Sequence, residues 1–114
     1  MIVSSNPNDE ITVVKPGVAR LTAANAKAFK DETLTLINNG ASQIVVDFSD
    51  VTFIDSSGLG ALVGVLKKIG NRGEINVAGL SNEVELMFRI CRMDSVFSIY
   101  GDVETAVQAL AENL

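Results

Sequence analysis

The run of residues 43–48 constrains the fold more than any other segment of the chain. It reads Gln-Ile-Val-Val-Asp-Phe, and its β-branched residues follow one another without a helical period. A short run of this kind is typical of a β-strand that is buried on both faces. Strands of this type occur in parallel sheets with helices on each side, so the run favours an α/β fold.

The rest of the chain alternates strand-like runs with segments of helical spacing. Further strands are predicted at residues 10–14, 18–21, 74–78 and 95–100, with an extended segment at 51–54. Helices are predicted at residues 23–38, 57–69, 82–91 and 102–112. This order predicts a single domain over residues 1–114, with a mainly parallel sheet of four or five strands and about four helices.

Two local features are predicted before the first helix. Lys15, Pro16 and Gly17 are turn residues, so residues 10–14 and 18–21 are expected to form a hairpin at one edge of the sheet. Residues 1–9 are polar and are expected to form a loose N-terminal segment.

The composition excludes several kinds of site and partner. The chain has no histidine and one cysteine, Cys91, so it can form no histidine-containing triad and no thiolate zinc site. We therefore expect no catalytic residue, no metal and no cofactor. A net charge of −5 without a basic stripe is unfavourable for nucleic-acid binding. Because the lone cysteine suits a reducing compartment and no apolar run could span a bilayer, we expect a cytoplasmic protein without membrane contact.

The segment Asp55-Ser56-Ser57-Gly58-Leu59-Gly60 joins an extended run to a predicted helix. Its hydroxyls lie where the first N–H groups of a helix lack partners, and a phosphate there would meet the positive end of the helix dipole. Asp55 or Ser56 could cap the helix, while Gly58 and Gly60 would let another protein approach the backbone. These features suit recognition and modification. Local chemistry alone nevertheless favours an ordinary helix start, because capping hydroxyls are common there.

A small nucleotide-binding or phosphoryl-transfer domain is the alternative interpretation of the 55–60 loop. Its glycines resemble a dinucleotide-binding fingerprint, but Val63 stands where the third glycine belongs, and no acidic residue follows the next strand. Asp55 could also accept a phosphoryl group, which requires a metal and further carboxylates. Asp47 and Asp50 are the nearest carboxylates in the sequence. Both signals are weak, so we do not expect an enzyme.

Residues 45–62 resemble the signature of the bacterial anti-sigma factor antagonists, the STAS-domain family. They read VVDFSDVTFIDSSGLGAL, and the likeness extends to residues 19–25 (ARLTAAN) and 88–97 (FRICRMDSVF). It covers about residues 10–112, which is nearly the whole chain. The resemblance implies a STAS-like single domain that acts in signal transduction and transcription regulation.

The resemblance also implies a phosphorylation site. In that family a partner serine kinase, often the anti-sigma factor itself, phosphorylates the first serine after the aspartate, which is Ser56 here. The unphosphorylated form would bind the partner, phosphorylation would abolish binding, and a serine phosphatase would restore it. The family pattern selects Ser56 over Ser57, because local chemistry leaves the two hydroxyls equivalent. The implied partner-binding residues are Asp55, Ser56, Ser57, Gly58, Leu59 and Gly60.

This chain departs from the family pattern at one position. Thr22 stands where the family often has an aspartate near the phosphorylated serine. Thr22 can cap the following helix, but the resemblance assigns no carboxylate role at this position.

Overall fold

The computed structural model describes the whole chain, residues 1–114. The strands are β1 (Val3–Asn8), β2 (Ile11–Lys15), β3 (Arg20–Leu21), β4 (Gln43–Asp47), β5 (Phe53–Ile54), β6 (Glu74–Ala78) and β7 (Ser98–Tyr100). The α-helices are α1 (Ala26–Asn38), α2 (Ser56–Ile69), α3 (Asn82–Ile90) and α4 (Val103–Glu112), and the short 3₁₀ helices are η1 (Gly70–Arg72) and η2 (Met93–Ser95). None of the helices combines the length and the apolar character needed to cross a membrane.

Five strands form one sheet in the order β1-β2-β4-β6-β7. The pairs β2–β4, β4–β6 and β6–β7 are parallel, and only the edge strand β1 runs antiparallel to its neighbour. β4 lies at the centre, where Ile44, Val45 and Val46 are completely buried, as the β-branched run predicted. The predicted α/β fold with a mainly parallel sheet and four helices is confirmed.

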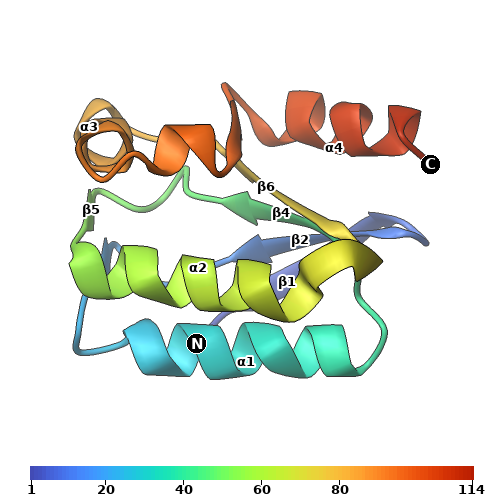
Figure 1. Ribbon diagram of the computed structural model, residues 1–114, viewed down its shortest axis with the longest axis horizontal. Helices are drawn as coiled ribbons and strands as arrows, with labels where there is room; N and C mark the ends of the chain where they lie inside the picture. Colours follow the sequence, from blue (N-terminus) through green and yellow to red (C-terminus); the bar gives the residue numbers. More distant parts are fainter.

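Helices cover both faces of this sheet. Figure 1 shows α1 and α2 side by side on one side of the sheet and α4 on the other. Phe29 of α1, Leu62 of α2 and Phe88 of α3 belong to one buried apolar cluster. Leu110 of α4 belongs to a second, smaller cluster, with Val45 of β4. The alternating side chains of the central strand therefore reach two separate cores, which explains why the run lacks any polar alternation.

The prediction that residues 1–9 are loose is wrong, because Val3–Asn8 form the edge strand β1. All six residues of β1 are exposed, so they carry no hydrophobic pattern that could reveal a strand. The strand is defined instead by antiparallel pairing with β2, in which Ser4 lies opposite Val14. The turn between the strands is closed by Asn8, whose Oδ1 accepts hydrogen bonds from the N–H groups of Glu10 and Ile11, at 2.9 and 3.0 Å.

The predicted hairpin of residues 10–14 with 18–21 is also wrong. β2 has β1 on one side and β4 on the other, so it has no free edge for residues 18–21. Of these residues only Arg20 and Leu21 are in a strand, β3, which pairs in parallel with β5 in a separate two-stranded sheet. Arg20 lies opposite Phe53, and Leu21 lies opposite Ile54. This pairing brings the chain after β3 next to the chain after β5, where Ser56 follows.

The remaining differences concern the ends of elements. The first helix begins at Ala26 and not at residue 23, because Thr22 first accepts hydrogen bonds at its carbonyl oxygen from the N–H groups of Asn25 and Ala26. The last strand begins at Ser98 and not at residue 95, because η2 occupies the residues before it.

Candidate functional site

Ser56 is the first residue of α2 and is exposed to solvent. The segment before it is fixed by β5, whose Ile54 is completely buried, and by a hydrogen bond from the Asp55 N–H to the Leu21 carbonyl oxygen at 3.2 Å. Ser57 is also exposed. The two hydroxyl groups therefore lie on a rigidly held helix start that solvent and another protein can reach.

Asp55 is the cap of α2. Its Oδ1 accepts hydrogen bonds from the N–H groups of Ser57 at 2.9 Å and Gly58 at 3.1 Å. Its Oδ2 accepts a third hydrogen bond, at 3.3 Å, from the N–H of Ala23 in the turn that follows β3. Both oxygens of this half-buried carboxylate are thus engaged within the chain, and Asp55, not Ser56, has the capping role.

This cap weighs against the nucleotide-binding interpretation of the loop. A loop that cradles phosphate offers unpaired backbone N–H groups, whereas Asp55 already occupies those of Ser57 and Gly58. The two carboxylates that might have assisted a phosphoryl acceptor are instead paired with a lysine. Asp47 and Asp50 both approach the Nζ of Lys15, at 3.9 and 3.4 Å.

The two glycines of the motif have different environments. A Cβ atom added at Gly58 would lie 2.7 Å from the Leu21 carbonyl oxygen and 2.7 Å from Cγ1 of Ile54, so the close packing of α2 on β3 and β5 requires a glycine. A Cβ atom added at Gly60 would meet nothing within 4 Å. Gly60 is exposed, its φ angle is not positive, and it lies one helical turn after Ser56 on the same side of α2.

The six predicted partner-binding residues therefore fall into two groups. Ser56, Ser57 and Gly60 are exposed, and they form the surface that a partner can touch directly. Gly58 is buried, Leu59 is only 3% exposed and belongs to the core, and Asp55 is half-buried. The structure thus places half of the predicted residues in supporting positions behind the surface.

Sequence reasoning missed two residues that shape this site. Arg20 places its guanidinium group over the ring of Phe53, 4.2 Å from the ring centroid, because β3 and β5 are paired in register. Asn25 closes the turn after β3: its Oδ1 accepts from the Thr22 N–H at 3.0 Å, and its Nδ2 donates to the Arg20 carbonyl oxygen at 2.9 Å. No local signal indicates the strand pairing, but the Asn25 side chain is of a type that commonly closes turns.

Thr22 does not cap α1 as predicted, because Asn25 holds the position before the helix, and Thr22 makes a contact within the preceding turn. Its Oγ1 accepts a hydrogen bond from the Ala24 N–H at 3.3 Å, and the helix itself begins four residues later at Ala26. The turn of residues 22–25 therefore carries no carboxylate of its own, and the carboxylate that reaches it belongs to Asp55.

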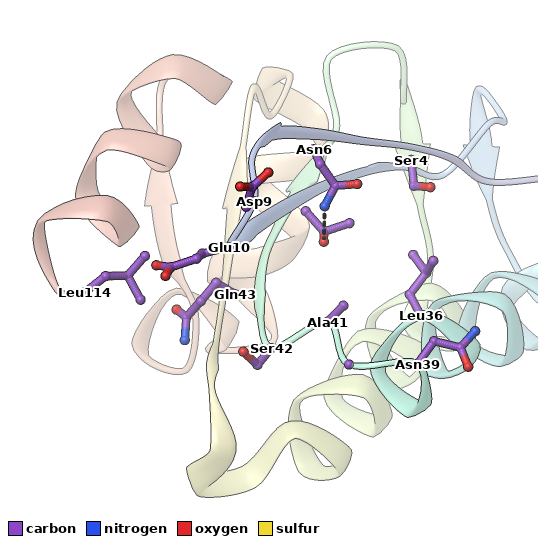
Figure 2. A pocket seen from close by; sticks show the side chains of 12 residues that line it. Ser4, Asn6, Asp9, Glu10, Leu36, Asn39, Ala41, Ser42, Gln43 and Leu114 are labelled. Atoms are coloured by element: carbon purple, nitrogen blue, oxygen red, sulfur yellow. Dashed lines mark hydrogen bonds between the residues drawn. The ribbon is translucent and has the colours of Figure 1, made fainter.

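A polar groove of about 700 Å³ lies elsewhere on the molecule (Figure 2). It is bounded by the turn between β1 and β2 and by the segment between α1 and β4, and it includes the hydrogen bond from Asn6 Nδ2 to Thr12 Oγ1 at 3.1 Å. Figure 1 shows that the end of α1 and the start of β4 lie at the opposite end of the molecule from β5 and the start of α2. The charged residues in its lining are Asp9 and Glu10, so it is poorly suited to phosphate ligands.

Comparisons with known proteins identify related chains. The family model for the STAS domain matches residues 5–106. A candidate anti-sigma factor antagonist of Thermotoga maritima is 30% identical over 102 residues, which cover 88% of this chain and 89% of that protein. The anti-sigma-B factor antagonist of Staphylococcus aureus is 31% identical over 76 residues, which cover 65% of this chain and 70% of that protein.

Two solved structures of SpoIIAA, a Bacillus cell fate determinant and anti-sigma factor antagonist, have the same fold. The unphosphorylated form has a TM-score of 0.71 and 17% identity, and the match covers 97% of this chain and 98% of SpoIIAA. The phosphorylated form has a TM-score of 0.72 and 18% identity, with coverage of 96% and 98%. At this identity the likeness extends to the fold alone.

Proposed function

The chain belongs to the STAS domain family, and from this membership and the exposure of Ser56 we propose that it is an anti-sigma factor antagonist switched by phosphorylation. In this proposal the unphosphorylated form binds an anti-sigma factor that is also a serine kinase, and phosphorylation of Ser56 abolishes the complex. A serine phosphatase restores binding. The protein acts by binding rather than by catalysis, in the cytoplasm, where the lone Cys91 stays reduced.

The observation that carries the proposal is the position of the Ser56 hydroxyl on an exposed and firmly held helix start. A kinase must reach this hydroxyl, and Ser56 lies at the surface as the first residue of α2. The relatives that share the family include the anti-sigma-B factor antagonist, and SpoIIAA has been solved in a phosphorylated form. The first finding supports a regulatory binding role for this chain, and the second shows that a protein of this fold can be phosphorylated.

The reaction at Ser56 is an ordinary phosphoryl transfer. Its Oγ attacks the terminal phosphorus of a nucleoside triphosphate, a new O–P bond forms, and the bond to the nucleoside diphosphate breaks. The hydroxyl proton passes to a base of the kinase. The phosphatase reverses the change by hydrolysis, which returns the hydroxyl and releases inorganic phosphate.

The effect on binding follows from charge and hydration. Phosphorylation adds a charge of about −1.5 to −2 and a group that is strongly hydrated. A tight protein interface over Ser56 would have to remove this hydration without supplying partners, which is unfavourable. The absence of a side chain at the exposed Gly60 supports such a tight interface, because a partner can approach the backbone of α2 one turn beyond Ser56.

Affinity capture with variants at Ser56 tests this proposal. Immobilised wild-type protein and Ser56→Ala should retain a serine kinase from an extract of the native cells, while Ser56→Asp should bind it at least about tenfold more weakly. Ser57→Ala is the matched control, because it removes the neighbouring exposed hydroxyl and should leave capture unchanged. Mass spectrometry after incubation of the captured kinase with ATP should find phosphate on Ser56. Equal capture by Ser56→Ala and Ser56→Asp would refute the switch, and phosphate on Ser57 would move the site by one residue.

A further inference from the structure

We propose that Asp55 is the positioning residue of the switch, and that phosphorylation of Ser56 displaces the Asp55 carboxylate from the turn of residues 22–25. This inference rests on the proposed phosphorylation of Ser56. It adds a second effect to the one already described, because the modified protein would differ from the unmodified one in backbone contacts as well as in charge.

The Asp55 carboxylate joins two segments that are far apart in the sequence. It accepts two hydrogen bonds from the first turn of α2 and one from the N–H of Ala23, a residue 32 positions earlier in the chain. The other side-chain hydrogen bonds of the turn are internal to residues 20–25. The Asp55–Ala23 hydrogen bond is therefore the side-chain hydrogen bond that joins this turn to the start of α2.

A phosphate on Ser56 would compete for the same donors. Asp55 and Ser56 are adjacent in the chain, with Cα atoms about 3.8 Å apart, so the phosphate and the Asp55 carboxylate both belong to the N-terminal end of α2. Phosphate is favoured at the N–H groups of a helix start, and here the N–H groups of Ser57 and Gly58 are already bound by Asp55. Two anions then share one set of donors, and phosphate next to an acidic side chain is disruptive through repulsion. Unlike a free nucleotide, the phosphate on Ser56 is held covalently at the helix start, and it carries the larger charge, so in this proposal it displaces Asp55 from the helix N–H groups.

The loss of Asp55 from this position leaves the Ala23 N–H without its partner. Ala23 and Ala24 are exposed and lie beside the start of α2, so the released turn belongs to the surface next to Ser56. A partner that contacts this surface would therefore meet a turn whose backbone is less ordered. The charge of the phosphate and the release of the turn would both weaken binding of the partner.

The test uses protein that carries phosphoserine at position 56, introduced during translation, so that neither kinase nor partner is needed. Amide hydrogen exchange of the full chain, resolved by residue, is compared with that of unmodified protein. We expect the Ala23 amide to exchange about fivefold faster, as for loss of one ordinary hydrogen bond. The amides of Ser57 and Gly58 should stay protected by the phosphate. The Thr105 amide, bound by the similar cap Asp102 at 2.7 Å, is the internal control and should not change.

Asp55→Asn provides the matched variant. Asparagine caps helices as well as aspartate, so α2 should keep its start. Its side chain has one acceptor oxygen and cannot also accept from Ala23, so the Ala23 amide should exchange fast before modification and change little after it.

Unchanged amide exchange at Ala23 on phosphorylation of the wild type would overturn the inference. Slower exchange would also overturn it, and would be expected if Arg20 bound the phosphate and made the turn more ordered. The inference would also be overturned if phosphorylation sped up amide exchange at Ala23 as much in Asp55→Asn as in the wild type. These outcomes are separate from the capture experiment. If Ser56→Asp loses its partner while phosphorylation leaves Ala23 exchange unchanged, the switch stands and the role of Asp55 is refuted. If phosphorylation speeds Ala23 exchange but no kinase is captured, the displacement of Asp55 stands and its role in a partner switch is refuted.

Discussion

Replacing Gly60 with alanine should make the protein more stable and a poorer binder. A glycine inside a helix is less favourable than alanine by about 0.5–1 kcal/mol, because it has more backbone freedom to lose on folding. The added methyl group at Gly60 meets no atom within 4 Å, so nothing offsets this gain. The free energy of unfolding should rise by about 0.5–1 kcal/mol, which raises Tm by roughly 2–4 °C for a domain of this size.

Gly58→Ala is the matched control for this prediction. Its methyl group would lie 2.7 Å from the Leu21 carbonyl oxygen, and crowding of this kind typically costs about 1–3 kcal/mol. Urea unfolding and calorimetry measure both changes, and titration calorimetry with the captured kinase measures binding. A lower stability of Gly60→Ala would show that the fold itself requires this glycine. If Gly60→Ala is more stable and binds the kinase as tightly as the wild type, the idea that Gly60 allows a partner close contact with the backbone of α2 is refuted.

Two further predictions concern stability. Asn76 on β6 is 1% exposed, and its Nδ2 is buried without a hydrogen-bond partner. Asn76→Val should therefore raise the free energy of unfolding, measured in urea, by about 1 kcal/mol. A loss of stability would mean that the amide has a structural role. The hydrogen bond from the Thr105 N–H lowers the pKa of Asp102 below its ordinary value of 3.8. The ionised Asp102 therefore stabilises the fold above pH 3.8, and this stabilisation is lost as the pH falls through the lowered pKa. Asp102→Asn keeps a cap that does not titrate, so its stability should fall less steeply in acid than that of the wild type, and parallel curves would contradict this assignment.

The sequence was most informative where one physical signal dominated. The β-branched run favoured a strand with a core on each side, and residues 43–47 form that central strand. The helical spacing after the motif likewise predicted α2 to within one residue of its start at Ser56. Both signals arise from burial, which leaves a strong mark on the choice of side chain.

The errors arose where backbone pairing decided the structure. β1 has six exposed residues, and its strand character comes from hydrogen bonding to β2 rather than from its own side chains. The pairing of β3 with β5 links Leu21 to Ile54, and no local pattern can predict a partner so distant in the chain. The same limit applies to the site: the motif indicated that Asp55 could cap a helix, whereas its bond to Ala23 depends on that long-range pairing.

The separation of β3 and β5 from the five-stranded sheet has a consequence for how such a protein can evolve. Strand β5, which leads into Ser56, shares its backbone hydrogen bonds with β3 and not with β4 or β6, so the hydrogen-bond ladder of the main sheet does not depend on this ribbon. Exposed residues in and beside the ribbon, such as Arg20 and Thr52, can therefore vary without any change to the backbone pairing of the five-stranded sheet.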